Sequence, residues 1–339
     1  MPITDLPAEL LLDIFTLACV DTGFTGCSLR GVSQHFRVLC TQSGVDVHTV
    51  ALCGVKKMKS FQAMLKERKQ DSSSTELSSQ VLQSISPREL RILSVDLPSW
   101  RPENGANPLF RQPFPFLTDL TLRCGLDVPF FNVFHPCPNL QRLHIASHKQ
   151  LPNTFGASIS RIAPDLKHLR LSGVDGPTKS GNLHQVLQAY TSSSPSSHPI
   201  ITDISDPLKA DHELPASVNK LIIGFDTCFQ FTHPIHSSRR QMNYLQNAQA
   251  IHQLAEDYRS RGHKETTTSN GERPVAGRGE RPIKLAQRKL LLVHPTPPMR
   301  PYDDVEEVAK ANFAKLRAEW EDRVQGGEAG WGDVPSSPA

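Results

Sequence analysis

Apolar residues at the start of this chain of 339 residues recur with the period of an α-helix. The first stripe is formed by Leu6, Leu10, Ile14 and Ala18, with Leu11 and Phe15 beside it. Gly23 and Gly26 then interrupt the pattern, and two shorter apolar segments follow, one after Cys27 and one around Phe36. Residues 1–43 are therefore predicted to form three short helices. A unit of this size buries little surface, so we expect it to need a partner or a second domain for stability.

A second pattern, with leucine or an equivalent residue at positions one, four and six, recurs between residues 90 and 223. Its units are Leu90, Leu93 and Val95; Leu117, Leu120 and Leu122; Leu140, Leu143 and Ile145; Leu166, Leu169 and Leu171; and Val218, Leu221 and Ile223. Successive units start 27, 23, 26 and 52 residues apart, so one unit is either degenerate or enlarged by the serine-rich segment TSSSPSSHP. This period predicts a solenoid of parallel strands. The alternative is a set of unrelated leucine-rich strands in an α/β domain, in which parallel pairing is still expected.

Segments on either side of the repeats extend this α/β fold. VHTVALCGV has strand character, and the helix predicted after it places Met58 and Phe61 on one face. KLLLVHP predicts a last buried strand, and a final apolar helical face includes Trp320 and Val324. We expect this last helix, together with Trp331, to cap an end of the repeat array, which would otherwise expose its core.

These patterns divide the chain into segments of different character. We predict a helical domain over 1–43, a repeat solenoid over 44–240, an amphipathic helix over 241–262, a disordered basic loop over 263–282, a last strand and capping helix over 283–331, and a disordered tail over 332–339.

The order of residues in the first helices resembles an F-box. The matching motifs are Leu-Pro-x-Glu-Leu from Leu6, Ile-Phe at Ile14, and Val-Ser-x-x-aromatic-Arg from Val32. Phe36 stands where F-boxes commonly have Trp, and the loop from Val20 to Gly26 is longer and richer in glycine. The resemblance implies docking on the Skp adaptor of a cullin-RING ubiquitin ligase. It implies that the adaptor-binding surface is formed or supported by Leu6, Pro7, Leu10, Ile14, Phe15, Leu29 and Val32.

The repeats resemble the irregular leucine-rich repeats of F-box proteins, and the closing segment resembles that of fungal members. No unit has Asn at its ninth position, so the side-chain ladder of more regular repeats is missing. Alternation along each strand points one set of side chains out of the sheet. Its middle is basic, and we expect an acidic or phosphorylated client protein to bind there. The candidate residues are Arg123, Arg142, His144 and Arg170.

Composition narrows the classes of function. The net charge is only +3, and no segment at the N-terminus has the pattern of a signal peptide or membrane span. We therefore expect a cytosolic or nuclear protein that does not bind membranes. The seven cysteines include no Cys-x-x-Cys pair, which predicts buried thiols rather than a metal site. No catalytic motif is present, so we predict a protein that is not an enzyme and has no cofactor or metal.

Three hypotheses about function follow. The first is a substrate-recruiting subunit of an SCF-type ubiquitin ligase, with the Skp adaptor and, through it, a cullin as partners, and an unknown client protein on the repeats. The second is a repeat scaffold for protein–protein interaction without a ligase. The third is an RNA-associated protein that uses the basic stretch 259–289; aromatic residues for base stacking are nearly absent there, so nucleic acid is the least favoured partner.

Overall fold

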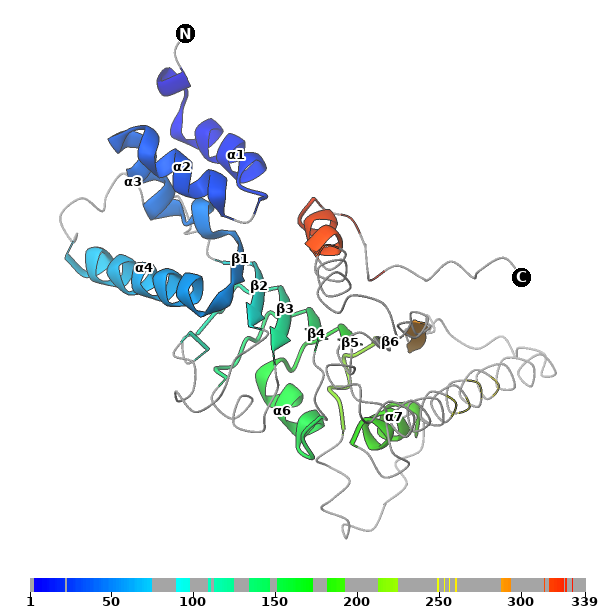
Figure 1. Cartoon of the computed structure of the whole chain (residues 1–339). Coiled ribbons are helices and arrows are strands. Elements are labelled where there is room, and N and C mark those ends of the chain that lie inside the picture. The colour runs from blue at the N-terminus through cyan, green and yellow to red at the C-terminus, as the bar shows by residue number, and fades with distance from the viewer. Residues whose placement is uncertain are drawn as a thin grey trace, which may run out of the picture.

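The computed structural model describes residues 3–21, 23–74, 90–97, 109–110, 113–124, 134–146, 151–172, 182–192, 213–224, 288–293 and 317–325, and single positions 249, 253, 256, 260, 314, 327 and 331. A parallel β-sheet with helices on its faces dominates this part of the chain, so the α/β class predicted from the sequence is confirmed (Figure 1).

The N-terminal unit contains three α-helices at the β1 end of the sheet (Figure 1). Its elements are η1 (Ile3–Asp5), α1 (Ala8–Ala18), α2 (Phe24–Val32), α3 (Gln34–Ser43) and η2 (Val45–Val47). Ser33 caps α3, because its hydroxyl accepts a hydrogen bond of 3.1 Å from the Phe36 N–H. The small core of this unit consists of Leu11, Leu12, Phe15, Phe36, Leu39, Cys40 and Val45.

Gly26 lies within α2, so the prediction that it interrupts the helical pattern is wrong. A Cβ at this position would lie 2.6 Å from the carbonyl oxygen of Asp46 and 2.8 Å from its Cα. The glycine therefore allows α2 to pack directly on the backbone of η2, which leads into the first strand.

The seven strands among the described residues are parallel and lie side by side in the order in which they occur in the chain. They are β1 (Thr49–Cys53), β2 (Ile92–Leu97), β3 (Asp119–Cys124), β4 (Arg142–Ala146), β5 (His168–Ser172), β6 (Lys220–Gly224) and β7 (Lys289–Val293). Every predicted repeat unit contributes one strand. The long spacing before the last unit adds no strand between its neighbours, since β5 pairs directly with β6, from His168 with Lys220 to Ser172 with Gly224.

One face of the sheet carries the main core. The inward residues of the middle strands, such as Leu143 and Leu169, are at most 2% exposed. They pack against α4 (Gly54–Ser74), α6 (Phe155–Ile162) and α7 (Asn182–Ser192). Met58 and Phe61 of α4 belong to this core, as their helical spacing predicts.

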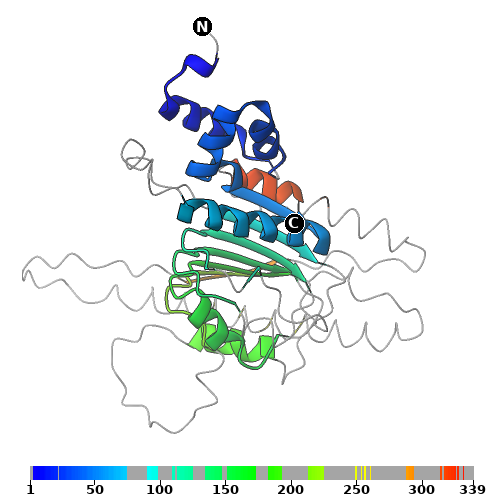
Figure 2. The ribbon, with the colours of Figure 1, turned by 90° about the vertical axis from the view of Figure 1, so that its left-hand side faces the viewer.

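The middle of the opposite face is covered by residues from the C-terminal part of the chain. Residues 317–324 form a helix that lies across this face, on the other side of the sheet from α6 and α7 (Figures 1 and 2). The prediction that this helix caps an end of the array is therefore wrong. The helix lies over the middle strands, where its charged residues form ion pairs with residues of β3 and β5.

Several other predictions concern residues that are described only in part. Of the predicted helix over 241–262, positions 249, 253, 256 and 260 are helical and exposed. The basic loop over 263–282 and the tail over 332–339 lie outside the described residues. Cys19, Cys40 and Cys137 are buried as expected, whereas Cys27 and Cys53 are exposed. Within the described ranges, no helix is long and apolar enough to cross a membrane.

Candidate functional site

Helix α1 has apolar residues on two of its sides, and only one of them packs inside the protein. Leu11, Leu12 and Phe15 face the small core and are at most 4% exposed. Leu10, Ile14 and Leu17 follow each other at spacings of four and three residues, which places them on one stripe of the helix. Their exposed fractions are 51%, 41% and 77%. We call this stripe, with Phe24 and Val32 of α2, the apolar helical face.

Most of the adaptor-binding residues predicted from the sequence lie at the surface. Pro7, Leu10, Ile14 and Val32 are exposed, and Leu6 and Leu29 are half-buried against the small core. Phe15 is 2% exposed, and its ring makes an edge-to-face contact with Phe36 at 4.9 Å between centroids. Phe15 therefore supports the helices from inside and is not available for direct contact with a partner.

Two residues of the apolar helical face were not among those predicted from the sequence to bind the adaptor. Leu17 and Phe24 are 77% and 73% exposed. Leu17 continues the spacing of Leu10 and Ile14, so helical periodicity could have identified it. Phe24 had no such signal, because Gly23 and Gly26 on either side suggested a loop.

The outward-facing side chains of β2 to β5 form a second surface, which we call the polar sheet face. The strand register places them in rows, one of which runs from Ser94 through Thr121 and His144 to Arg170. The sequence predicted this orientation correctly. The face is not open, however, because the C-terminal segment covers its middle: His144 is 0% and Arg170 is 6% exposed.

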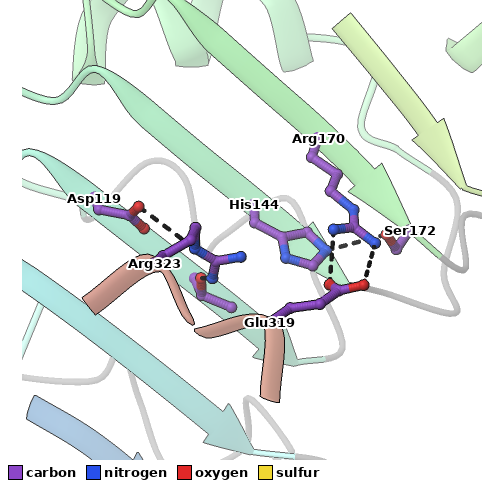
Figure 3. A network of polar contacts seen from close by, with 7 residues as sticks. Asp119, His144, Arg170, Ser172, Glu319 and Arg323 are labelled. Carbon is purple, nitrogen blue, oxygen red and sulfur yellow. Dashed lines mark hydrogen bonds and ion pairs between the residues drawn. The ribbon is translucent and has the colours of Figure 1, made fainter. Parts of the chain in front are cut away.

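Glu319 of the C-terminal helix binds Arg170 of β5 through two hydrogen bonds (Figure 3). Nη1 of Arg170 donates to Oε2 at 2.7 Å, and Nη2 donates to Oε1 at 3.3 Å. This two-point geometry is the one in which arginine binds carboxylates most strongly. Next to the pair, Nε2 of His144 lies 3.0 Å from the hydroxyl of Ser172.

Arg323 of the same helix inserts over β3 (Figure 3). Its Nη2 donates a hydrogen bond of 2.9 Å to the Thr121 hydroxyl, and its Nε lies 3.6 Å from Oδ2 of Asp119. Arg142 also contacts Asp119, with its Nε 3.1 Å from the same oxygen. The helix thus crosses the sheet from Glu319 over β5 to Arg323 over β3.

Two tryptophans complete this contact. Trp320 and Trp331 are each 2% exposed. The Trp331 ring lies 5.7 Å from the ring of His168 and 6.0 Å from the guanidinium carbon of Arg323. Buried apolar side chains and ion pairs therefore both bind the C-terminal segment to the polar sheet face.

Burial shifts the pKa values of three residues in this cluster. Burial, followed by the charges of Arg170 and Arg323, lowers the pKa of His144 well below its usual value, so the imidazole is neutral near pH 7. Burial also raises the pKa of Asp119, while Arg323 and Arg142 act in the opposite direction. Arg323 has a lowered pKa because it is buried, although Asp119 raises it.

The four residues predicted to bind a client are brought to one face, but each has a partner within the chain. Arg142 and Arg170 bind Asp119 and Glu319 as described above. Nη1 of Arg123 lies 3.5 Å from Asp96 Oδ2 at the ends of β3 and β2. The predicted open basic surface is therefore wrong for His144 and Arg170, because a segment distant in sequence supplies the charges that cover it.

No group of three or more histidine, cysteine or acidic side chains suited to a metal ion occurs in the described ranges. No protein-family model matches this chain, and no curated protein matches it. Evidence for a function therefore comes from the two surfaces themselves.

Proposed function

We propose that this protein is a substrate-recruiting F-box subunit of an SCF-type ubiquitin ligase. In this proposal the N-terminal helices bind the Skp adaptor and, through it, a cullin. The parallel sheet is an irregular leucine-rich-repeat solenoid that holds a client protein. The chain itself carries out no bond chemistry, since holding the client near the ligase raises its effective concentration there.

The observation that carries the proposal is the exposed apolar stripe on α1. A helix in a folded monomer normally buries its apolar side and exposes polar residues. Helix α1 buries one apolar side and still exposes Leu10, Ile14 and Leu17. Exposed apolar surface of this kind is typical of protein–protein interaction sites. Leu10 and Ile14 also carry the F-box resemblance, so pattern and exposure point to the same function.

Exposure also bears on the scaffold hypothesis. If the first helices only stabilised the sheet, Leu10 and Ile14 would be buried against it. They are exposed, and the small core that stabilises the helices is formed by other residues. The ligase hypothesis explains the exposure of these leucine and isoleucine side chains as contact with an adaptor, and the scaffold hypothesis does not explain it.

Co-expression with a Skp adaptor tests the proposal. Wild-type protein is expected to form a complex that survives size-exclusion chromatography, and the Leu10→Asp, Ile14→Asp double variant is expected to lose it. Both residues are exposed, so the variant should keep the fold, which circular dichroism would check. Val38→Asp is the matched control, because Val38 is 43% exposed but lies on α3. A folded wild-type protein that forms no complex would overturn the proposal and leave the scaffold hypothesis.

A further inference from the structure

The polar sheet face already holds an occupant, which is the chain's own C-terminal segment. Its contacts show what this surface recognises. Arg170 receives a carboxylate at two points, and Asp119 and Thr121 receive a guanidinium. The two groups that fill these positions, Glu319 and Arg323, are four residues apart, so one side of a single helix presents both.

The fit of this occupant is incomplete. Oδ1 of Asp119, Nδ1 of His144 and the indole nitrogens of Trp320 and Trp331 are buried, and none has a hydrogen-bond partner among the described residues. A buried polar atom without a partner destabilises the state that contains it. A partner that supplied hydrogen bonds to Asp119 and His144 of the sheet would therefore bind better than the resident segment, whose two indole N–H groups would return to water on its release.

We propose that the polar sheet face is a binding surface for a helical segment of a partner protein, and that the C-terminal segment occupies it in the absence of that partner. The partner segment carries a carboxylate for Arg170 and, four residues later, a guanidinium for Asp119 and Thr121. The identification of this partner protein as the client of a ligase rests on the proposed function. The charges that the partner segment must carry do not depend on that function. Because the resident segment is part of the same chain, it competes at high effective concentration and admits only partners that bind better.

Charge reversal at one position separates the resident segment from the surface. Glu319→Arg places two guanidinium groups together and is expected to release the segment from Arg170. Glu321→Arg is the matched control, because Glu321 lies on the same helix and pairs with Arg317 at a more exposed site, with 2.7 Å between the charged atoms. Release exposes Trp320 and Trp331, so the tryptophan emission should shift to longer wavelength in Glu319→Arg and stay unchanged in Glu321→Arg.

The direct test uses a fluorescein-labelled synthetic peptide of residues 313–333 and the full-length protein, with binding followed by fluorescence anisotropy. The peptide is expected to bind the Glu319→Arg protein at least tenfold more tightly than the wild-type or Glu321→Arg protein. A peptide with Glu319→Arg should not bind the Glu319→Arg protein. The same variant peptide should bind the Arg170→Glu protein, in which the charge at the binding site is reversed. This combination of peptide and protein provides the test if the Glu319→Arg protein does not fold.

Two outcomes would overturn the proposal. The first is failure of the peptides to bind either folded variant protein, which would make the C-terminal segment a permanent part of the fold. The second is a dimer of the wild-type protein that exchanges C-terminal segments, which would identify a second copy as the occupant. Adaptor binding by α1 is measured separately on the same proteins, so failure of the ligase proposal and failure of this one are distinguishable.

Discussion

Single residues decide how closely helix α2 packs on η2, the short helix that precedes the first strand. Gly26 is the clearest case, because the backbone of Asp46 occupies the space that a side chain would need. Gly31 lies on the same helix, but a Cβ there would point into open space, with nothing within 4 Å. The two glycines therefore have different roles, although the sequence alone does not distinguish them.

Gly26→Ala is expected to lower the free energy of unfolding by about 1–3 kcal/mol, because backbone atoms must move to admit the methyl group. The control Gly31→Ala should raise it by up to about 1 kcal/mol, since alanine favours the helix. Urea denaturation of both variants measures the difference. Equal effects at the two positions would contradict the role given to Gly26.

His144 makes stability depend on pH. Its pKa is lowered in the folded protein by burial and by Arg170 and Arg323. The unfolded chain, with a histidine pKa of about 6.5, therefore binds more protons than the folded one as the pH falls below that value. The free energy of unfolding therefore does not depend on His144 protonation above about pH 6.5. Below that pH it decreases by up to about 1.4 kcal/mol per pH unit because of His144.

The measurement compares urea denaturation of the wild type and His144→Gln between about pH 6.5 and 5.5, a window just below the usual histidine pKa. Asp119 and Asp96 have raised pKa values, which act with the opposite sign, but they are present in both proteins. The difference between the two slopes therefore isolates His144. Parallel slopes would show that His144 is protonated equally in the folded and unfolded states.

At the scale of an element, α1 uses its two apolar sides differently. The side with Leu11 stabilises the helical unit, and the side with Leu10 faces solvent. Leu11→Ala is expected to lower the free energy of unfolding by about 2–5 kcal/mol, as is usual for a buried leucine. Leu10→Ala should change it by no more than about 0.5 kcal/mol.

Thermal and urea denaturation of these two variants provide the check, and adaptor binding provides a second readout. Leu10→Ala should weaken adaptor binding while leaving stability unchanged. Similar losses of stability at both positions would mean that Leu10 is part of the core, and would contradict the proposed role of the apolar helical face in adaptor binding.

At the scale of the whole molecule, one contact joins parts of the chain that are 149 residues apart, namely Arg170 and Glu319. Both side chains are largely buried, with exposed fractions of 8% and 14%. Removal of either partner leaves a charge in a dry environment, so Arg170→Ala and Glu319→Ala should each destabilise the protein. The double variant should lose less than the sum of the two.

The expected coupling in this double-mutant cycle is about 0.5–3 kcal/mol, the range for residues in direct contact. It is measured from the unfolding free energies of the wild type, the two single variants and the double variant. Additive effects would indicate that the C-terminal helix does not contribute to stability through this pair.

Local pattern was sufficient for α1 and for the strands and their order, whereas α6 and α7 were not predicted from it. The three-four spacing of Leu10 and Ile14 predicts α1, and the recurring leucines predict parallel strands, because periodicity is a property of neighbouring residues. The same alternation places Arg142 and Arg170 on the outward side of the sheet. Only the tertiary structure decided what covers them, since the partners Glu319 and Arg323 come from a distant part of the chain. It also decided which side of α1 is buried, because that choice depends on the α3 residues packed against it.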